Sequence, residues 1–175
     1  MTLMNRLTTW GMVGAVWGVV GFSLILGWPI VRLAYRFIEA WELRAQWGVL
    51  HWLVLVTFIF FMAYTEGYRG FQKAFSPRCA ARVQHLRHNP TLLRVILAPL
   101  FVMTFFASIR KRLIVSYAIT AMVIVFIVGF RLIPQPWKGI LDAGVVVGLT
   151  WGLISFLFYL WPALSDKLNI NPEVR

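Results

Sequence analysis

Four long apolar runs set the strongest limit on how this chain can fold. They cover residues 10–31, 47–65, 113–130 and 140–164, and Asp142 is the only Asp, Glu, Lys or Arg within them. A helix needs about 20 consecutive apolar residues to cross a bilayer. The runs therefore predict an all-α, polytopic transmembrane helical bundle with four spans, and we expect residues 1–175 to form a single integral membrane domain.

The composition excludes the other common classes of protein. Hydrophobic residues make up 60% of the chain and charged residues 13%, whereas about a quarter of the residues of a soluble protein are charged. A disordered chain needs low hydrophobicity, and a disulfide scaffold needs more cysteines than Cys79 alone. A soluble domain, a disordered chain and a disulfide-rich module are thus ruled out.

The first run lies close to the amino terminus, behind Arg6, as the apolar core of a signal peptide does. It is longer than the roughly 7–15 apolar residues of such a core and lacks a small-residue cleavage site, so we expect an uncleaved helix. Pro29 is predicted to bend the chain. The residues that follow show the spacing of a helix lying at the membrane interface, with one apolar face made of Ala34, Phe37, Ile38 and Trp41.

Residues 91–109 approach the length of a span but contain Arg94 and Pro99. Lys and Arg in short loops favour the cytoplasmic side. If this stretch does not cross, the inner side carries Arg6, Arg69, Lys73, Arg78, Arg82, Arg87, Arg94, Arg110, Lys111, Arg112, Lys167 and Arg175, and the outer side only Arg32, Arg36, Arg44, Arg131 and Lys138. We therefore predict a re-entrant or interfacial helical hairpin on the cytoplasmic side, with a fifth span as the alternative.

The aromatic residues agree with this orientation, because Trp and Tyr concentrate at the two membrane interfaces. The inner belt would consist of Trp10, Tyr64, Tyr68 and Trp161, and the outer belt of Trp28, Trp47, Trp52 and Trp137. Both termini are then cytoplasmic. A short multi-pass chain without a targeting extension fits a bacterial inner membrane, which is the location we expect.

Residues 66–112 form a basic segment on the predicted cytoplasmic side. We expect the second helix to continue beyond the bilayer until Ser76-Pro77 stops it, and a short amphipathic helix to follow over residues 77–88. Basic residues beside an apolar row attract the anionic headgroups of the inner leaflet. The candidate site for a headgroup or a small anion consists of Glu66, Arg69, Lys73, Arg78 and Arg82. The alternative is that these residues only enforce topology, with Glu66 and Arg69 forming an ordinary i, i+3 pair.

Two helices carry glycines at helical spacing, and such faces let helix backbones approach closely in lipid. The candidate packing residues are Gly11, Gly14, Gly18 and Gly21 in the first helix and Gly144, Gly148 and Gly152 in the last. One interpretation is that the first helix packs against the last within the chain. The other is a contact with a second copy or with a larger membrane complex.

Side chains that catalyse reactions, bind metals or carry protons are rare in this chain, which argues against an enzyme or a pump. The central thirds of the spans contain no Asp, Glu, Lys, Arg or His, so the ion and proton sites of pumps are missing. His51 has no second axial ligand for haem, and the spacing of Cys79, His85 and His88 matches no zinc pattern. We predict no metal, no cofactor and no enzymatic activity.

The remaining charged residues have structural or electrostatic roles. Lys138 and Asp142 are i, i+4 at the start of the last helix, where Arg131 is also expected to approach Asp142. The net charge of +11 does not indicate nucleic acid, because the basic clusters flank apolar runs and lipid headgroups explain them.

Three hypotheses follow for the function. The first is a non-enzymatic scaffold or accessory subunit that binds anionic lipid or a membrane partner. The second is a small oligomeric channel or carrier for a solute, with the stretch around Pro99 lining its path. The third is a membrane enzyme acting on a headgroup near Glu66 and His85, which lacks an acid and base pair.

Overall fold

The computed structural model describes residues 3–130 and 132–174, with the side chains of residues 3–8 and 127 excepted. The chain is 82% helical and the described residues form no strand, which confirms the all-α prediction. The elements are α1 (Leu3–Glu42), the 3-10 helix η1 (Arg44–Gln46), α2 (Val49–Met62), the π-helix η2 (Ala63–Phe75), α3 (Ser76–His88), α4 (Leu92–Ile96), α5 (Ala98–Val102), α6 (Arg110–Phe130) and α7 (Trp137–Leu164).

Helix α1 is one continuous helix of 40 residues that contains Pro29. The separate interfacial helix predicted after Pro29 is therefore not formed, because the same helix continues to Glu42. The reason lies in packing: Ala40 is fully buried and, with Phe37, belongs to a cluster that includes Leu55 of α2 and Ile140 of α7. These contacts hold the second half of α1 against its neighbours. They offset the loss of the backbone hydrogen bond that a proline inside a helix causes.

The second long helix is also continuous, because α2, η2 and α3 join into one helix over Val49–His88. The prediction that Ser76-Pro77 stops it was wrong. Ser76 keeps helical dihedral angles (φ −58°, ψ −45°), and its N–H donates to the carbonyl of Phe71 in the π-helical pattern. Pro77 directly follows the π-helical segment, at the point where α3 begins. Instead of capping, the Ser76 hydroxyl donates to the Gly152 carbonyl at 3.2 Å.

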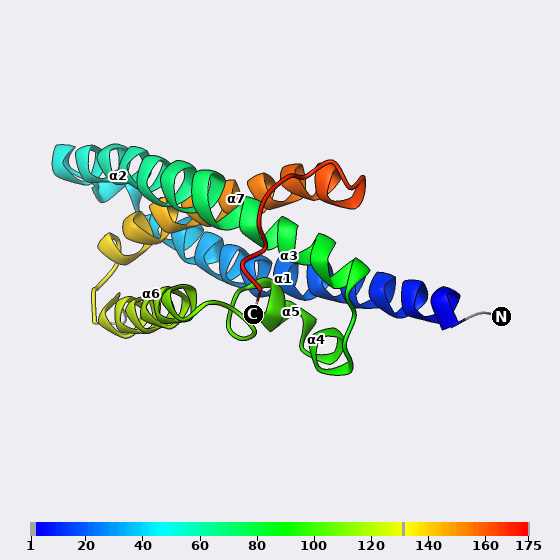
Figure 1. The fold of residues 1–175 in the computed structure, drawn as a ribbon. Helices are drawn as coiled ribbons and strands as arrows, with labels where there is room; N and C mark the ends of the chain where they lie inside the picture. Colours follow the sequence, from blue (N-terminus) through cyan, green and yellow to red (C-terminus); the bar gives the residue numbers. More distant parts are fainter. Residues whose placement is uncertain (1–2, 131, 175) are drawn as a thin grey trace.

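Three long helices lie side by side and form the core (Figure 1). Helix α7 runs antiparallel to α1, since its start at Gly139 faces Ala40 and its later residue Phe156 packs on Phe22. The central cluster joins Phe22, Val83 and Phe156 from the three helices. Two further clusters of buried residues lie around Ala40 and Ile140 and around Leu86 and Phe101, so the described core consists of three clusters.

Residues 91–109 do not form a fifth span. Helices α4 and α5 have five residues each and are separated at Leu97, so each rises only about 8 Å. Within the described residues, four helices are long and apolar enough to cross a membrane: Thr9–Glu42, Val49–His88, Arg110–Phe130 and Trp137–Leu164. The chain therefore has the elements of a four-span membrane protein plus a short helical hairpin.

Both glycine faces are filled by the chain's own residues, but not by each other. On α1, Gly18 accommodates Val102 and Ala98 of the hairpin, and Gly11 lies against the backbone of Arg87. On α7, Gly144 accommodates Phe58 and Gly152 accommodates Phe71. Gly14 and Gly21 also face the hairpin, and Gly148 faces Glu66. The first helix does pack against the last within the chain, as one interpretation predicted, but the glycines of the two helices admit other neighbours.

Helix α6 is set apart from the other long helices (Figure 1). None of its candidate span is buried within the described part of the chain, and its mean hydropathy is 2.6. Its side-chain polar contacts with other described segments lie in its first half, where Arg112 binds Glu173 and the Tyr117 hydroxyl donates to the Phe105 carbonyl at 3.0 Å. The sides of α6 are therefore open to lipid.

Candidate functional site

Arg82 of α3 lies inside the protein, with none of its surface exposed. Its Nε donates to the Phe101 carbonyl at 2.7 Å, and its Nη2 donates to the carbonyls of Phe106 (2.9 Å) and Ala107 (3.1 Å). Its Nη1 donates to the Pro172 carbonyl at 3.2 Å. With the tail in place, Arg82 does not face lipid headgroups as predicted, because backbone carbonyls accept the hydrogen bonds of its guanidinium group.

Helix α5 supplies one of these four acceptors, Phe101, and the turn after it supplies two, Phe106 and Ala107. Thr104 (φ 70°) and Ala107 (φ 48°) adopt left-handed backbone conformations, which L-residues with a Cβ rarely do unless the surroundings compensate. The guanidinium carbon also lies 4.1 Å from the centre of the Phe101 ring, a favourable cation–π geometry. Arg82 therefore binds the hairpin and its following turn to α3.

The carboxyl-terminal tail completes the same site. After α7 it turns back toward α5 (Figure 1), and Val174 packs on the cluster that contains Phe101. The Ser108 hydroxyl donates to the Glu173 carbonyl at 3.3 Å, and Ser108 forms a single antiparallel bridge with Val174. The tail is thus attached through residues 172–174 to the turn before α6.

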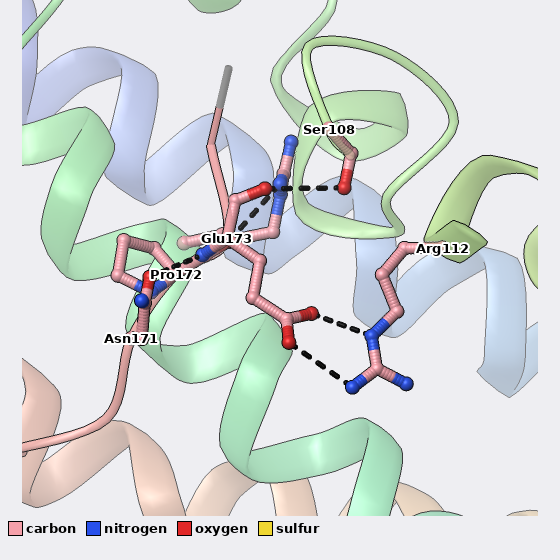
Figure 2. A network of polar contacts seen from close by, with 6 residues as sticks. Ser108, Arg112, Asn171, Pro172 and Glu173 are labelled. Carbon is pink, nitrogen blue, oxygen red and sulfur yellow. Dashed lines mark hydrogen bonds and ion pairs between the residues drawn. The ribbon is translucent and has the colours of Figure 1, made fainter. Parts of the chain in front are cut away.

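Arg112 holds the side chain of Glu173 with two parallel hydrogen bonds (Figure 2). Arg112 Nε donates to Oε2 at 2.6 Å and Nη2 donates to Oε1 at 3.0 Å. The hydrogen bonds from Arg112 hold the pKa of Glu173 below its ordinary value, and the positive charges of Arg112, Arg78 and Arg82 lower it further. One carboxylate therefore sits among three guanidinium groups.

Acid is expected to loosen the tail. Because the folded pKa of Glu173 lies below its ordinary value of 4.5, its stabilising contribution is complete above that value and is lost as pH falls through the lowered pKa. A nitroxide label at the exposed Asn169, with Cys79→Ala, should gain mobility in the electron paramagnetic resonance spectrum over that interval.

Two controls separate Glu173 from its neighbours. Glu173→Gln should give a mobile label already at neutral pH. Asp166→Asn should retain the transition, although the pKa of Asp166 is itself lowered, chiefly by a hydrogen bond with His88. A label whose mobility is the same in Glu173→Gln as in the unaltered chain would contradict this prediction.

The other predicted headgroup residues have different environments. Arg69 and Lys73 of η2 are exposed, and the Lys73 Nζ lies 4.5 Å from the centre of the Tyr68 ring. Neither forms an ion pair within the described residues. Arg78 is partly exposed on α3. Three of the five predicted residues are therefore accessible to an anion.

Glu66 does not belong with them. Its Oε2 is buried without a hydrogen-bond partner, and a Cβ added to Gly148 would lie 2.8 Å from this oxygen. The predicted ion pair between Glu66 and Arg69 is not formed in the described chain. The physical reason is the wider turn of the π-helix, which does not place residues three apart on one face as an α-helix does.

At the other end of the bundle, Asp142 of α7 is buried and lies 3.7 Å from the Arg36 guanidinium of α1. The Gln135 side chain donates to the Arg36 carbonyl at 3.3 Å and accepts the Gly139 N–H at 3.1 Å. Asp142 thus links α7 to α1 instead of pairing with Lys138, and the predicted approach of Arg131 lies outside the described residues.

Potential metal ligands are dispersed. Cys79 is buried, and His88 Nε2 lies 2.7 Å from Asp166. Among the described residues, no group of three or more His, Cys, Asp or Glu side chains is placed to hold a metal ion.

Sequence reasoning missed Arg112 and Glu173 as partners. Arg112 was counted only as a topology signal, and Glu173 was not singled out. A usable signal was present, because the chain has only six acidic residues and 17 basic ones. An acid beyond the last span, on the same side as a basic segment, has many possible partners there.

Comparison with known proteins adds no family to these observations. No family model, no curated protein and no solved structure matches the chain. The function has to be inferred from the arrangement of its own residues.

Proposed function

We propose that this protein is a non-enzymatic scaffold or accessory subunit of a bacterial inner membrane that holds anionic lipid on its cytoplasmic side. Both termini lie in the cytoplasm in this proposal, and the chain crosses the membrane four times. The four apolar helices support the membrane assignment, and the excess of basic residues at one end supports the orientation.

The observation that carries the proposal is a set of exposed basic side chains without acidic partners. Arg69, Lys73, Arg110 and Lys111 are exposed, and none forms an ion pair in the described chain. Each basic residue near an anionic surface contributes about 1 kcal/mol to membrane attraction. The basic surface is therefore free to bind headgroups.

Removing part of this surface should weaken the preference for anionic lipid. We expect Arg69→Gln combined with Lys73→Gln to lower anionic-lipid binding by about tenfold or more, since two charges contribute roughly 2 kcal/mol. Native mass spectrometry of protein released from mixed-lipid nanodiscs measures the lipid that remains bound.

The matched control is Arg32→Gln combined with Arg44→Gln, which removes the same charge from exposed positions at the opposite end. This variant should keep the anionic preference. The preference of the unaltered protein should also fall as salt rises through physiological strength, where the Debye length is about 8 Å. Equal lipid retention by the two double variants would contradict the proposal.

A homo-oligomer or a larger membrane complex also belongs to the proposal as a partner. The surface that contacts such a partner has to lie elsewhere than on the glycine faces. The glycine face of α1 is covered mainly by the hairpin, and the glycine face of α7 is covered by the helix of residues 49–88. Blue-native electrophoresis of the protein extracted in mild detergent tests for such an assembly.

The channel hypothesis has one supporting feature, a groove of about 730 Å³ along α7 whose lining includes Gln72, Thr150 and Ser155. Against it stands the position of Pro99, which is buried against Gly21. A measured flux of solute into liposomes that contain the protein would support this second candidate function.

A further inference from the structure

The guanidinium groups around Glu173 form an incompletely neutralised site. Arg112 binds the carboxylate directly, and the charges of Arg78 and Arg82 act on the same group. Arg78 has no ion-pair partner of its own among the described residues. Among the described residues, one carboxylate is thus in direct contact with one guanidinium group and under the influence of two more, which leaves the site attractive to a second or more highly charged anion.

The tail that supplies this carboxylate is held by few groups. Its last described residues are held by the hydrogen bonds from Arg82 to Pro172, from Ser108 to Glu173 and from Arg112 to Glu173, and its start is held by the ion pairs of Asp166 with Arg87 and His88. Glu173 itself has φ 50°, an unfavourable backbone conformation for a residue with a Cβ. Release of the tail would free donors on both Arg82 and Arg112.

The donors that release exposes match the chemistry of phosphate. Arginine binds phosphate oxygens with the same paired hydrogen bonds that it makes to a carboxylate. A phosphate monoester carries more charge and more acceptor oxygens than Glu173 does. The site also adjoins the exposed Arg110 and Lys111 at the start of the apolar helix α6, where a headgroup would lie.

We propose that Arg78, Arg82 and Arg112 form a binding site for a phosphate group, and that Glu173 is an internal ligand which a phosphate-bearing headgroup displaces. The carboxyl-terminal tail then acts as a latch over the site. The assignment of the phosphate to a lipid rests on the proposed function, whereas the site itself rests on the geometry around Glu173.

The test uses the full-length protein in neutral detergent, with a nitroxide at Asn169 and Cys79→Ala. Three probes are added: short-chain phosphatidic acid, short-chain phosphatidylcholine and inorganic phosphate. Phosphatidic acid should mobilise the label in a saturable manner, and phosphatidylcholine should do so much more weakly, because its choline offsets the phosphate charge. Tail mobility that no phosphate compound changes would overturn the proposal.

Binding affinity gives a second readout that does not depend on the label. If the latch is closed about nine tenths of the time, its removal raises apparent affinity by about tenfold. Glu173→Gln should therefore bind phosphatidic acid more tightly, by up to about that factor, whereas Arg112→Gln should bind it more weakly. Unchanged affinity in Glu173→Gln would contradict the latch even if both variants remain folded.

The comparison of the three probes also distinguishes the phosphate site from the proposed function. Tail release by inorganic phosphate as effectively as by phosphatidic acid would support the site and assign its ligand to soluble phosphate. If the binding of anionic lipid depends on Arg69 and Lys73 but does not change the mobility of the tail, the proposed function is supported and the latch is overturned.

Discussion

Replacing Arg82 by leucine is expected to lower the free energy of unfolding by about 3–5 kcal/mol, the cost typical of breaking a buried charged interaction. Leucine retains much of the apolar volume but leaves the carbonyls of Phe101, Phe106, Ala107 and Pro172 without their donor. Each buried polar group without a partner costs about 1–3 kcal/mol. Reversible unfolding in mixed micelles measures the change.

Two further variants identify the cause. Arg82→Lys keeps the charge but not the planar fork that reaches several carbonyls, so we expect an intermediate loss. Arg69→Gln changes an exposed residue of the same type and should alter stability by less than about 0.5 kcal/mol. A stable Arg82→Leu variant would mean that the carbonyl contacts do not hold the hairpin and tail in place.

Gly11→Ala should be the second most damaging substitution, with a loss of about 2–3 kcal/mol, as for overpacking of a core. An added Cβ would overlap the carbonyl oxygen of Arg87 and lie 2.9 Å from its carbonyl carbon. Both atoms belong to backbone, so no side-chain rotation relieves the overlap, and α1 has to separate from α3. Thermal unfolding in detergent measures the effect.

Gly27→Ala is the matched control in the same helix. A Cβ at Gly27 meets no atom within 4 Å, and alanine is a better helix former than glycine by about 0.5–1 kcal/mol. The two substitutions should therefore change stability in opposite directions. The same sign for both would show that close approach at Gly11 does not limit the packing of α1.

The spans were predictable because the number of consecutive apolar residues is a property of the sequence alone. The hairpin was predictable for a related reason, since the basic triplet after residue 109 and Pro99 both disfavour a crossing. The π-helix η2 was not, because no residue pattern in 63–75 distinguishes it from an α-helix. Its wider turn then altered which residues face one another around Glu66.

Arg82 shows most clearly what sequence patterning misses. On an isolated helix it belongs to a polar row with Arg78 and His85, which suggests a surface position. In the fold, its acceptors come from α5, from the turn after it and from the tail, where Pro172 is the most distant in sequence. Backbone carbonyls have no residue-type signature, so no sequence pattern could have paired them with this side chain. The glycines were recognised correctly as sites of close approach, but their partners also depend on how the helices are arranged.

The central claim is that the chain crosses the membrane four times with its basic segment in the cytoplasm. Single cysteines at Asn89, Lys111 and Pro134, in a Cys79→Ala background, test it by labelling with an impermeant thiol reagent from either side of sealed cells and inverted vesicles. All three positions are accessible in the fold. We predict that Asn89 and Lys111 react only from the cytoplasmic side and Pro134 only from the outside. Reaction of Asn89 and Lys111 from opposite sides would contradict the four-span arrangement.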